Sequence, residues 1–199
     1  MTNLAAVYTL ICDMSRFPYD EAYLELMRSR KYEETAELIN RARWDFVAEF
    51  GFRVVLDYGC GLGFLAKFAP DGVTVDSFDV GRMENGEPYP QTGIIHPHYD
   101  CLCFFDVLEH VPNPLVLNPV FNMTDHVAVS VPMLPDGKDI ENWKHNKYRE
   151  NEHIHYFTRK SLEQFFAVRG FVRVKEGRPE EVVREDIYSA VFRKGGGHD

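Results

Sequence analysis

The sequence predicts an α/β fold in which a mostly parallel sheet ends in a C-terminal antiparallel hairpin. The first observation is that buried-strand runs alternate with helical patterns after residue 51, as in βαβ units whose strands lie parallel. The second is that the last two strand runs, "FVRVKEG" and "IYSAVFRK", are joined without a helix, which is typical of a hairpin. A length of 199 residues and a hydrophobic content of 45% suit one core of this kind.

Helical patterns occupy the N-terminal region. Apolar residues recur at helical spacing in two segments that follow Pro18, and Gly51 is a typical helix stop. We expect these segments to form an N-terminal helical cap, residues 1–50, beside a main domain that spans 51–194. The glycine-rich end, 195–199, is expected to be a flexible tail.

The main domain presents its strands and helices in order along the chain. Short apolar runs rich in β-branched and aromatic residues predict four strands before the hairpin. These runs are "FRVVLD", "VTVDSFDV", "YDCLCFF" and "HVAVSVPM". Helical patterns are "FLAKFA" after the first run and "RKSLEQFFAVRG" before the hairpin, where Gly170 is the expected stop. The stretch "GRMENGEPYPQTG" is rich in turn formers and predicts a loop.

The stretch "DYGCGLG" follows the first strand run and places three glycines at alternate positions. A strand that runs into such a loop and then a helix binds nucleotide-like ligands, because glycines let a ligand approach the main chain. Asp79 ends the next strand run, where a carboxylate can accept hydrogen bonds from ribose hydroxyls. The sixth position counted from Gly59 is Phe64, whereas the dinucleotide fingerprint has glycine there. The loop therefore favours a nucleotide-like ligand other than a dinucleotide.

Several stretches of the chain resemble motifs of one enzyme family. "VLDYGCGLGFLAKFA", "VDSFDV" and "YDCLCFFDVLEHVPNP" are similar to successive motifs of class I S-adenosylmethionine-dependent methyltransferases. "DVLEHV" and "EHIHYFTRKSLEQFFAVRGF" resemble the subgroup that includes ubiquinone-biosynthesis O-methyltransferases. The resemblance covers residues 52–194. It implies a Rossmann-like methyltransferase fold, with helices on both faces of the sheet, and S-adenosyl-L-methionine as the cofactor.

The resemblance also implies which residues contact the cofactor. The first motif would hold its methionine end, the acid that ends the second strand would bind its ribose, and the next residue would lie against its adenine. Two residues at the end of the third run, which is the fourth strand in the family order, would border it. The positions in this chain are Asp57, Gly59, Gly61, Asp79, Val80, Phe105 and Asp106. Few residues separate Asp79 from Asp100, so the family's third strand and its adenine-contacting acid are expected to be shortened or absent.

The chemistry that the resemblance implies needs few protein groups. Methyl transfer from a sulfonium is an in-line displacement, so the protein mainly aligns the reactants in a water-poor pocket. A base is needed only where the acceptor must lose a proton early. The candidate catalytic residues are His110 and His155, the latter with its neighbour Tyr156, since both segments are expected near the reactants. A second interpretation of His110, that it only fixes a loop at a helix start, stays open.

The histidines and cysteines do not predict a metal site. The possible partners of His155 match no common zinc spacing; they are His145, Glu152 and His153. Cys101 and Cys103 share one strand face and are expected to be buried reduced thiols, and the chain has no Cys-x-x-Cys pair. We therefore expect no metal.

Composition restricts the partners and the compartment. The net charge of −9 and the pI near 5.4 leave no overall basic footprint for nucleic acid, so we expect none as a partner. No apolar stretch is long enough to span a membrane, and the first residues lack a signal-peptide pattern. The expected localisation is cytoplasmic.

The expected function is transfer of a methyl group to a small-molecule acceptor, with S-adenosyl-L-homocysteine as product and O-methylation favoured. Aromatic side chains are a candidate lid over an aromatic or apolar acceptor; they are Tyr8, Phe17, Tyr19, Tyr23, Tyr32, Trp44, Trp143 and Tyr148. The alternative is a catalytically silent methyltransferase-like module that binds the cofactor or a protein partner. A nicotinamide-dependent oxidoreductase is disfavoured by Phe64. The oligomeric state is not predicted.

Overall fold

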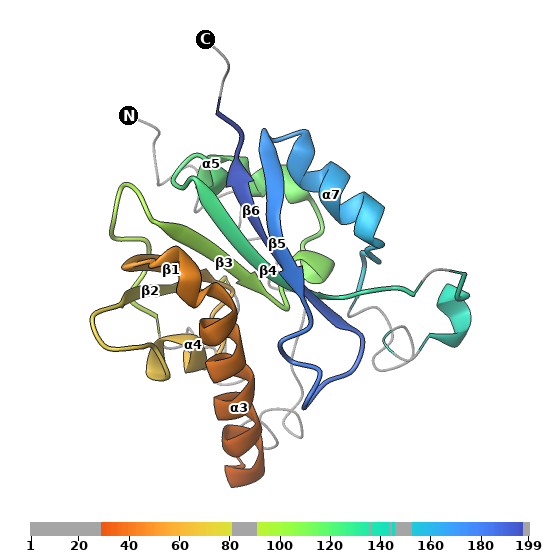
Figure 1. Cartoon of the computed structure of the whole chain (residues 1–199), viewed down its shortest axis with the longest axis horizontal. Helices are drawn as coiled ribbons and strands as arrows, with labels where there is room; N and C mark the ends of the chain where they lie inside the picture. The colour runs from red at the N-terminus through yellow and green to blue at the C-terminus, as the bar shows by residue number, and fades with distance from the viewer. Residues whose placement is uncertain (1–28, 81–90, 136, 144, 146–152, 197–199) are drawn as a thin grey trace.

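A six-stranded sheet forms the centre of the protein in this computed structural model, which describes residues 29–80, 91–135, 137–143, 145 and 153–196 (Figure 1). The strand order is β2-β1-β3-β4-β6-β5. The bounds are β1 Val54–Tyr58, β2 Thr74–Phe78, β3 Cys101–Phe105, β4 His126–Pro132, β5 Phe171–Gly177 and β6 Ile187–Lys194. The first four strands run parallel, whereas β6 pairs antiparallel with β4 and β5. The predicted sheet and its C-terminal hairpin are therefore confirmed.

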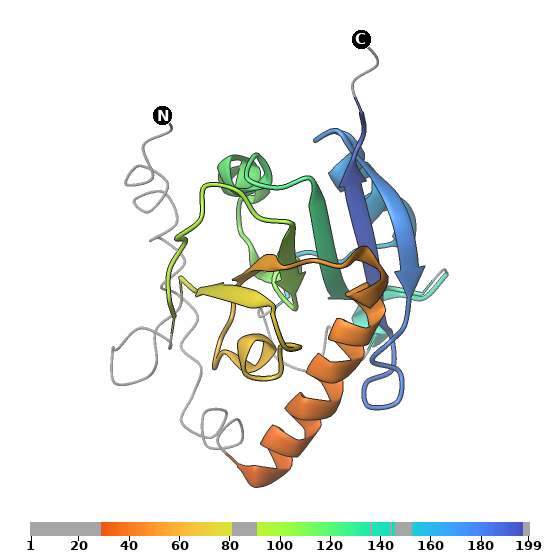
Figure 2. The same cartoon turned by 60° about the vertical axis from the view of Figure 1, so that its left-hand side comes forward.

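Helices cover both faces of this sheet, as the resemblance implied (Figures 1 and 2). α3 (Arg30–Val47) and the single turn α4 (Phe64–Lys67) pack on one face, and α5 (Asn118–Phe121) and α7 (Arg159–Ala167) on the other. α7 begins after Thr158, whose side chain forms a reciprocal capping box with the serine three positions on. Among the helices of the described ranges, none combines the length and the apolar character that a membrane crossing requires.

The second of the two predicted N-terminal helical segments is confirmed. Ser29 caps α3 by accepting a hydrogen bond from the Tyr32 amide at 3.2 Å. The 3₁₀ turn η2 (Ala48–Phe50) follows, and Gly51 ends it with a φ of 64°. The first predicted segment lies outside the described residues. The division of the chain at residue 50 stays a prediction.

Side chains of the sheet alternate between two packed layers, because successive strand residues point to opposite faces. Phe104 belongs to the layer that α5 and α7 cover. Cys101 and Cys103 belong to the other layer, together with Trp44 of α3. Trp44 also donates from Nε1 to the Leu65 carbonyl at 3.0 Å, which joins α3 to α4. Both cysteines are buried and free, as predicted.

A loop, and no strand of the described ranges, lies along the outer edge of β2. Two loop amides donate to the Ser77 carbonyl at 3.0 Å each. The buried Asp76 carboxylate accepts a 2.6 Å hydrogen bond from the Tyr99 hydroxyl and lies 2.8 Å from His96 Nδ1. These bonds satisfy part of the open sheet edge. The arrangement agrees with the predicted shortening or absence of the family's third strand.

Candidate functional site

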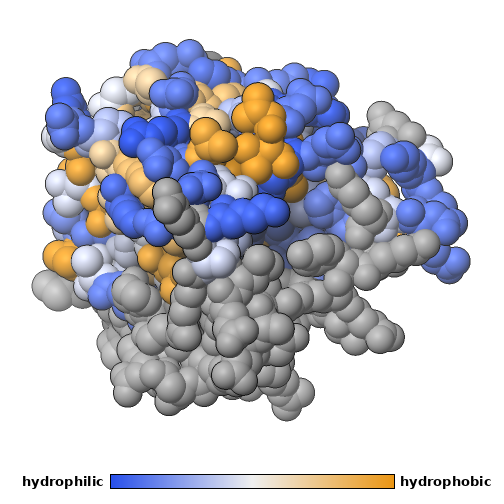
Figure 3. Space-filling model, turned by 90° about the horizontal axis from the view of Figure 1, so that it is seen from below, coloured by the Kyte–Doolittle hydropathy of each residue, from blue (hydrophilic) through white to orange (hydrophobic). Residues whose placement is uncertain are grey.

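A cavity of about 740 Å³ lies at the carboxyl ends of the parallel strands, where open α/β sheets bind ligands. We call one side the glycine wall: Asp57, Gly59, Cys60, Gly61, Leu62 and Asp79. We call the other side the charged wall: Arg43, Asp106, Glu109, His110, His153 and Arg184. Figure 3 shows the molecule from below, the side toward which α3 extends. The described residues visible on this side are mostly hydrophilic, and apolar residues gather there in a few places. The volume lies within the usual range of small-molecule sites.

The glycine wall needs glycine at two positions for different reasons. Gly59 has a φ of 83°, and a Cβ there would lie 2.5 Å from Val107 Cγ2, closer than side chains pack. Gly61 has a φ of 50°, but a Cβ there would meet no atom within 4 Å. Gly59 is therefore required by packing, whereas Gly61 leaves its main chain open to a ligand in the cavity.

Two carboxylates complete the glycine wall. Asp79, which follows β2, accepts a hydrogen bond from the Gly61 amide at 2.8 Å, so it fixes the loop as well as lining the cavity. Asp57 is 4% exposed, and burial raises its pKa to about 7. The positive charge of Arg43 lowers the pKa of Asp57, and the negative charge of Asp79 raises it further. A positively charged ligand group in the cavity would therefore stabilise the ionised form of Asp57.

Four charged side chains form a closed network at the charged wall. The Arg43 guanidinium donates to Asp106 Oδ2 at 2.6 Å and to Glu180 Oε1 at 2.8 Å. Arg184 donates to the two Asp106 oxygens at 3.1 and 2.9 Å, and to Glu180 Oε2 at 2.9 Å. Glu180 is fully buried behind the wall. The charges of two arginines and two carboxylates cancel, so each buried charge in the network has a partner of opposite sign within it.

This network joins three distant parts of the chain at Asp106. Asp106 directly follows β3 and has a φ of 59°, which is uncommon for a residue other than glycine. Burial alone would raise the pKa of Asp106, but the guanidinium groups of Arg184 and Arg43 outweigh it and hold the pKa below its usual range. The carboxylate therefore stays ionised and anchors both α3 and the connection between β5 and β6.

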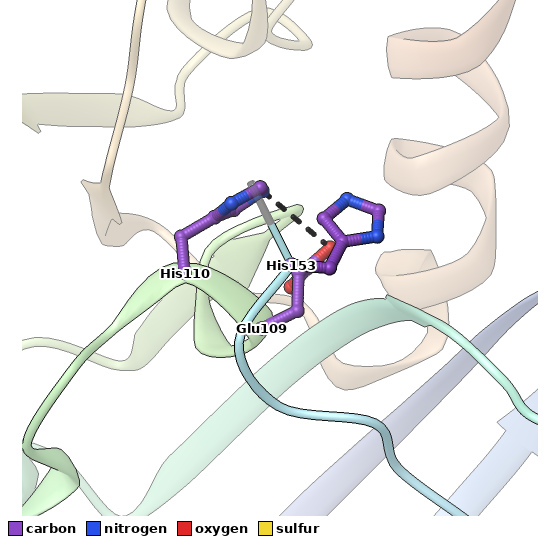
Figure 4. Close-up of side chains that lie close together, drawn as sticks. All are labelled: Glu109, His110 and His153. Carbon is purple, nitrogen blue, oxygen red and sulfur yellow. Dashed lines mark ion pairs between the residues drawn. The ribbon is translucent and has the colours of Figure 1, made fainter. Parts of the chain in front are cut away.

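A glutamate and two histidines lie together in the charged wall (Figure 4). The 3₁₀ turn η3 (Leu108–His110) carries Glu109 and His110. The Glu109 carbonyl accepts hydrogen bonds from the amide of Ile154 at 2.9 Å and from the next amide at 3.1 Å, which brings His153 beside η3. His110 Nε2 lies 3.9 Å from Glu109 Oε1, and the rings of His110 and His153 have centroids 4.9 Å apart.

Burial controls the protonation of this cluster. Glu109 is 2% exposed, and neither carboxylate oxygen has a hydrogen-bond partner among the described residues. Burial, with Asp106 adding to it, raises the pKa of Glu109 well above its usual range. His153 Nδ1 is likewise buried without a partner in the described chain, and burial with His110 and His145 lowers the pKa of His153 to about 4. Burial therefore favours the neutral forms of both Glu109 and His153.

Most of the predicted site residues line the cavity. These are Asp57, Gly59, Gly61, Asp79, Phe105, Asp106 and His110. Val80 packs against the core instead, and His155 contacts the Val111 carbonyl through Nε2 at 2.8 Å; neither lines the cavity. Of the candidate lid residues that the structure describes, Tyr32 lines the cavity, whereas Trp44 and Trp143 are buried and do not line it. The roles of all these residues stay predictions.

Sequence reasoning missed much of the charged wall. Arg43, Arg184 and Glu180 were not predicted, because their ion pairs join segments that are far apart in the sequence. One signal was available: Arg43 follows Ile39 by one helical turn, so it lies on the buried face of α3. A charged residue on such a face needs a partner.

Comparisons with known proteins give one family. A family profile described as a methyltransferase domain matches residues 26–176 of this chain. The ubiquinone biosynthesis O-methyltransferase of Klebsiella pneumoniae subsp. pneumoniae is 33% identical over 122 residues, and the match covers 47% of this chain and 50% of that protein. The Vibrio cholerae protein of the same name is 34% identical over 127 residues, and the match covers 49% of this chain and 51% of that protein. The chain thus spans about half the length of these curated relatives.

A solved structure is similar over nearly the whole chain. It is the 1,6-didemethyltoxoflavin-N1-methyltransferase of Burkholderia thailandensis, with a TM-score of 0.61 and 20% identity. The match covers 96% of this chain and 89% of that one. That structure holds 1,6-didemethyltoxoflavin and S-adenosylhomocysteine. At this identity the similarity supports the fold alone.

Proposed function

This chain belongs to the family of class I S-adenosylmethionine-dependent methyltransferases, and on this premise we propose that it transfers a methyl group from S-adenosylmethionine to a small-molecule acceptor. The observation that carries the proposal is the cavity itself. The glycine wall meets the charged wall at the carboxyl edge of the sheet, and the cavity of about 740 Å³ suits a nucleoside-sized cofactor beside a small acceptor.

The glycine wall fits S-adenosylmethionine. The open side of Gly61 leaves the main chain within reach of a ligand, and the Asp79 carboxylate is an acceptor for ribose hydroxyls. Asp57 lies at the same wall and would carry its negative charge when a cationic amino group approaches. We assign the cofactor to Asp57, Gly59, Gly61 and Asp79, with Phe105 and Asp106 bordering it.

The protein's part in the reaction is mainly alignment. S-adenosylmethionine supplies a methyl group on a sulfonium, which is electrophilic without further activation. The network of Arg43, Asp106 and Arg184 fixes the charged wall, so the acceptor meets a preorganised surface. His110 lines the cavity and is our candidate for accepting an acceptor proton; its alternative role is to fix the η3 turn. His155 contacts a main-chain carbonyl, so we assign it a positioning role.

The acceptor atom is proposed to be oxygen. The two curated relatives reported above are named O-methyltransferases, which supports this choice. The similar Burkholderia structure is named an N1-methyltransferase, so the fold is compatible with nitrogen as well. Tyr32 in the cavity supports an acceptor with an aromatic or apolar part, because its ring offers an apolar surface there.

Calorimetry with S-adenosylhomocysteine and with NAD tests the proposal. We expect S-adenosylhomocysteine to bind with a micromolar Kd, and Asp79→Ala to weaken it by roughly 100-fold, because two or more hydrogen bonds to a charged group are lost. Asp71→Ala is the matched control, since Asp71 is exposed and does not line the cavity. Binding of NAD alone, or of neither ligand, would overturn the proposal. Binding without turnover on a broad acceptor panel would favour the silent module.

A further inference from the structure

We propose that Glu109, His110 and His153 form a binding site for one divalent transition-metal ion, with Zn²⁺ as the best match. Two imidazoles and one carboxylate are the donor set of many catalytic zinc sites, which keep a further position open. Imidazole ligands also distinguish such a site from the all-oxygen sites that Mg²⁺ and Ca²⁺ prefer. The three side chains come from η3 and from the segment that docks on it.

The three side chains are close enough to converge on one ion. One ligand atom from each lies within 4.8 Å of the others, and the Glu109 Oε1 to His110 Nε2 distance is 3.9 Å. Ligands of a tetrahedral Zn²⁺ lie about 3.4 Å apart. Rotation of the three side chains can bring their ligand atoms from the present separations to this spacing. The main-chain hydrogen bonds from the segment after His153 to the Glu109 carbonyl already hold the backbones together.

The buried carboxyl group of Glu109 is the independent observation that points to a cation. Both of its oxygens are buried and lack hydrogen-bond partners among the described residues. The arginines that act on it, Arg184 and Arg43, already bond to Asp106 and Glu180. A buried polar group without a partner is costly and rare in a native protein. A divalent ion would satisfy Glu109 and also the buried Nδ1 of His153, or its Nε2 after a ring rotation.

Three protein ligands would leave a further coordination position open, and all three residues line the cavity. An acceptor oxygen bound there would have a lowered pKa, as a metal-bound hydroxyl does. The acceptor class that follows is one with a hydroxyl or phenol oxygen able to coordinate a metal. With an ion bound, the lowered pKa of the acceptor oxygen would take the place of the proton-accepting role proposed for His110, because His110 would be a metal ligand. This consequence rests on the proposed function, whereas the metal site itself does not.

Metal binding by the full chain tests the site without any activity measurement. The protein is freed of metal with a chelator and dialysed against Zn²⁺; Co²⁺ serves as a coloured substitute whose visible spectrum reports its ligands. We expect one ion per chain. Glu109→Gln and His153→Ala should each weaken binding by roughly tenfold or more. His98→Ala is the matched control, since His98 is exposed and outside the cavity, and it should bind like the wild type.

A second measurement separates loss of the site from loss of the fold. Glu109→Gln is nearly isosteric, so the metal-free variant should fold and unfold at a temperature close to that of the metal-free wild type. Added Zn²⁺ should raise the Tm of the wild type only. The inference is wrong if Zn²⁺ does not bind at one per chain, or if Glu109→Gln and His153→Ala bind it normally. A chain that binds S-adenosylhomocysteine but no Zn²⁺ would keep the proposed function and lose this inference.

Discussion

The glycine wall and the charged wall of the cavity are built in opposite ways. The glycine wall comes from the end of β1 and from the neighbouring loops after β1 and β2, and mainly main-chain bonds hold it. The amides of Gly59 and Cys60 both donate to the Phe78 carbonyl, at 2.7 and 3.1 Å. The charged wall combines α3, the end of β3, the segment at His153 and the connection between β5 and β6. Side-chain ion pairs, such as Arg43 to Asp106, hold it together.

This difference determines which kind of substitution disrupts each wall. A wall held by main-chain bonds depends on backbone conformation, so it is sensitive to a single added Cβ. A wall held by buried ion pairs depends on charge balance, so it is sensitive to the loss of one partner. The two walls should therefore respond to different substitutions, and the predictions below test that separation.

The largest effect is expected from Arg43→Met in the charged wall. The change leaves Asp106 and the fully buried Glu180 with only Arg184, and breaking a buried ion pair costs about 3–5 kcal/mol. Urea unfolding measures this loss. Arg41→Met is the control, because Arg41 is exposed and its pair with Glu37 contributes about 0.5 kcal/mol or less. Equal effects of the two substitutions would contradict a charge-dependent wall.

A smaller effect is expected in the glycine wall, where Gly59→Ala and Gly61→Ala should differ. Gly59→Ala combines a left-handed backbone with a contact to Val107, so we expect a loss of about 2–4 kcal/mol in unfolding free energy. Gly61→Ala has only the backbone cost of about 1–2 kcal/mol, since a Cβ there meets no atom. Its methyl group should instead weaken S-adenosylhomocysteine binding. Normal binding by Gly61→Ala would show that no ligand approaches this main chain.

The smallest effect is a pH dependence that belongs to Asp57. Its pKa is about 7 in the folded chain, mainly through burial, whereas the ordinary pKa of an aspartate side chain is 3.8. Between about pH 4 and 7 the folded state therefore holds more protons than the unfolded state, so ionisation of Asp57 lowers stability as the pH rises. Compared with Asp57→Asn, the wild type should lose about 1.4 kcal/mol of unfolding free energy or less for each pH unit across this window. Urea unfolding of both proteins at several pH values measures the difference; parallel curves would contradict it.

Local features of the fold could be predicted from the sequence. The strands are continuous apolar runs, and the glycine loop is a contiguous motif whose geometry depends on its own residues. The "FLAKFA" pattern was less informative: α4 forms a single turn, because Pro70 disfavours helical backbone at the residue before it. The hydrogen bonds from residues 91–99 to β2 also had no sequence signal, since they depend on how a loop folds over an edge.

The charged wall could be predicted only in part. Asp106 and His110 were expected in the site, but the ion pairs of Asp106 with Arg43 and Arg184 join segments that meet only in the folded chain. The same reason explains why no metal site was expected. His153 lies beside Glu109 and His110 only because its segment packs on η3 in the folded chain. The sequence spacing around His155 carried no information about this cluster.

An amide NMR titration with S-adenosylhomocysteine tests most directly whether the glycine wall holds the cofactor. Backbone ¹H–¹⁵N signals of the wild type are followed as the ligand is added. We expect the largest shifts at Gly59, Cys60 and Gly61, whose main chain lines the cavity. Shifts confined to the charged wall, or no saturable shift at all, would contradict the account.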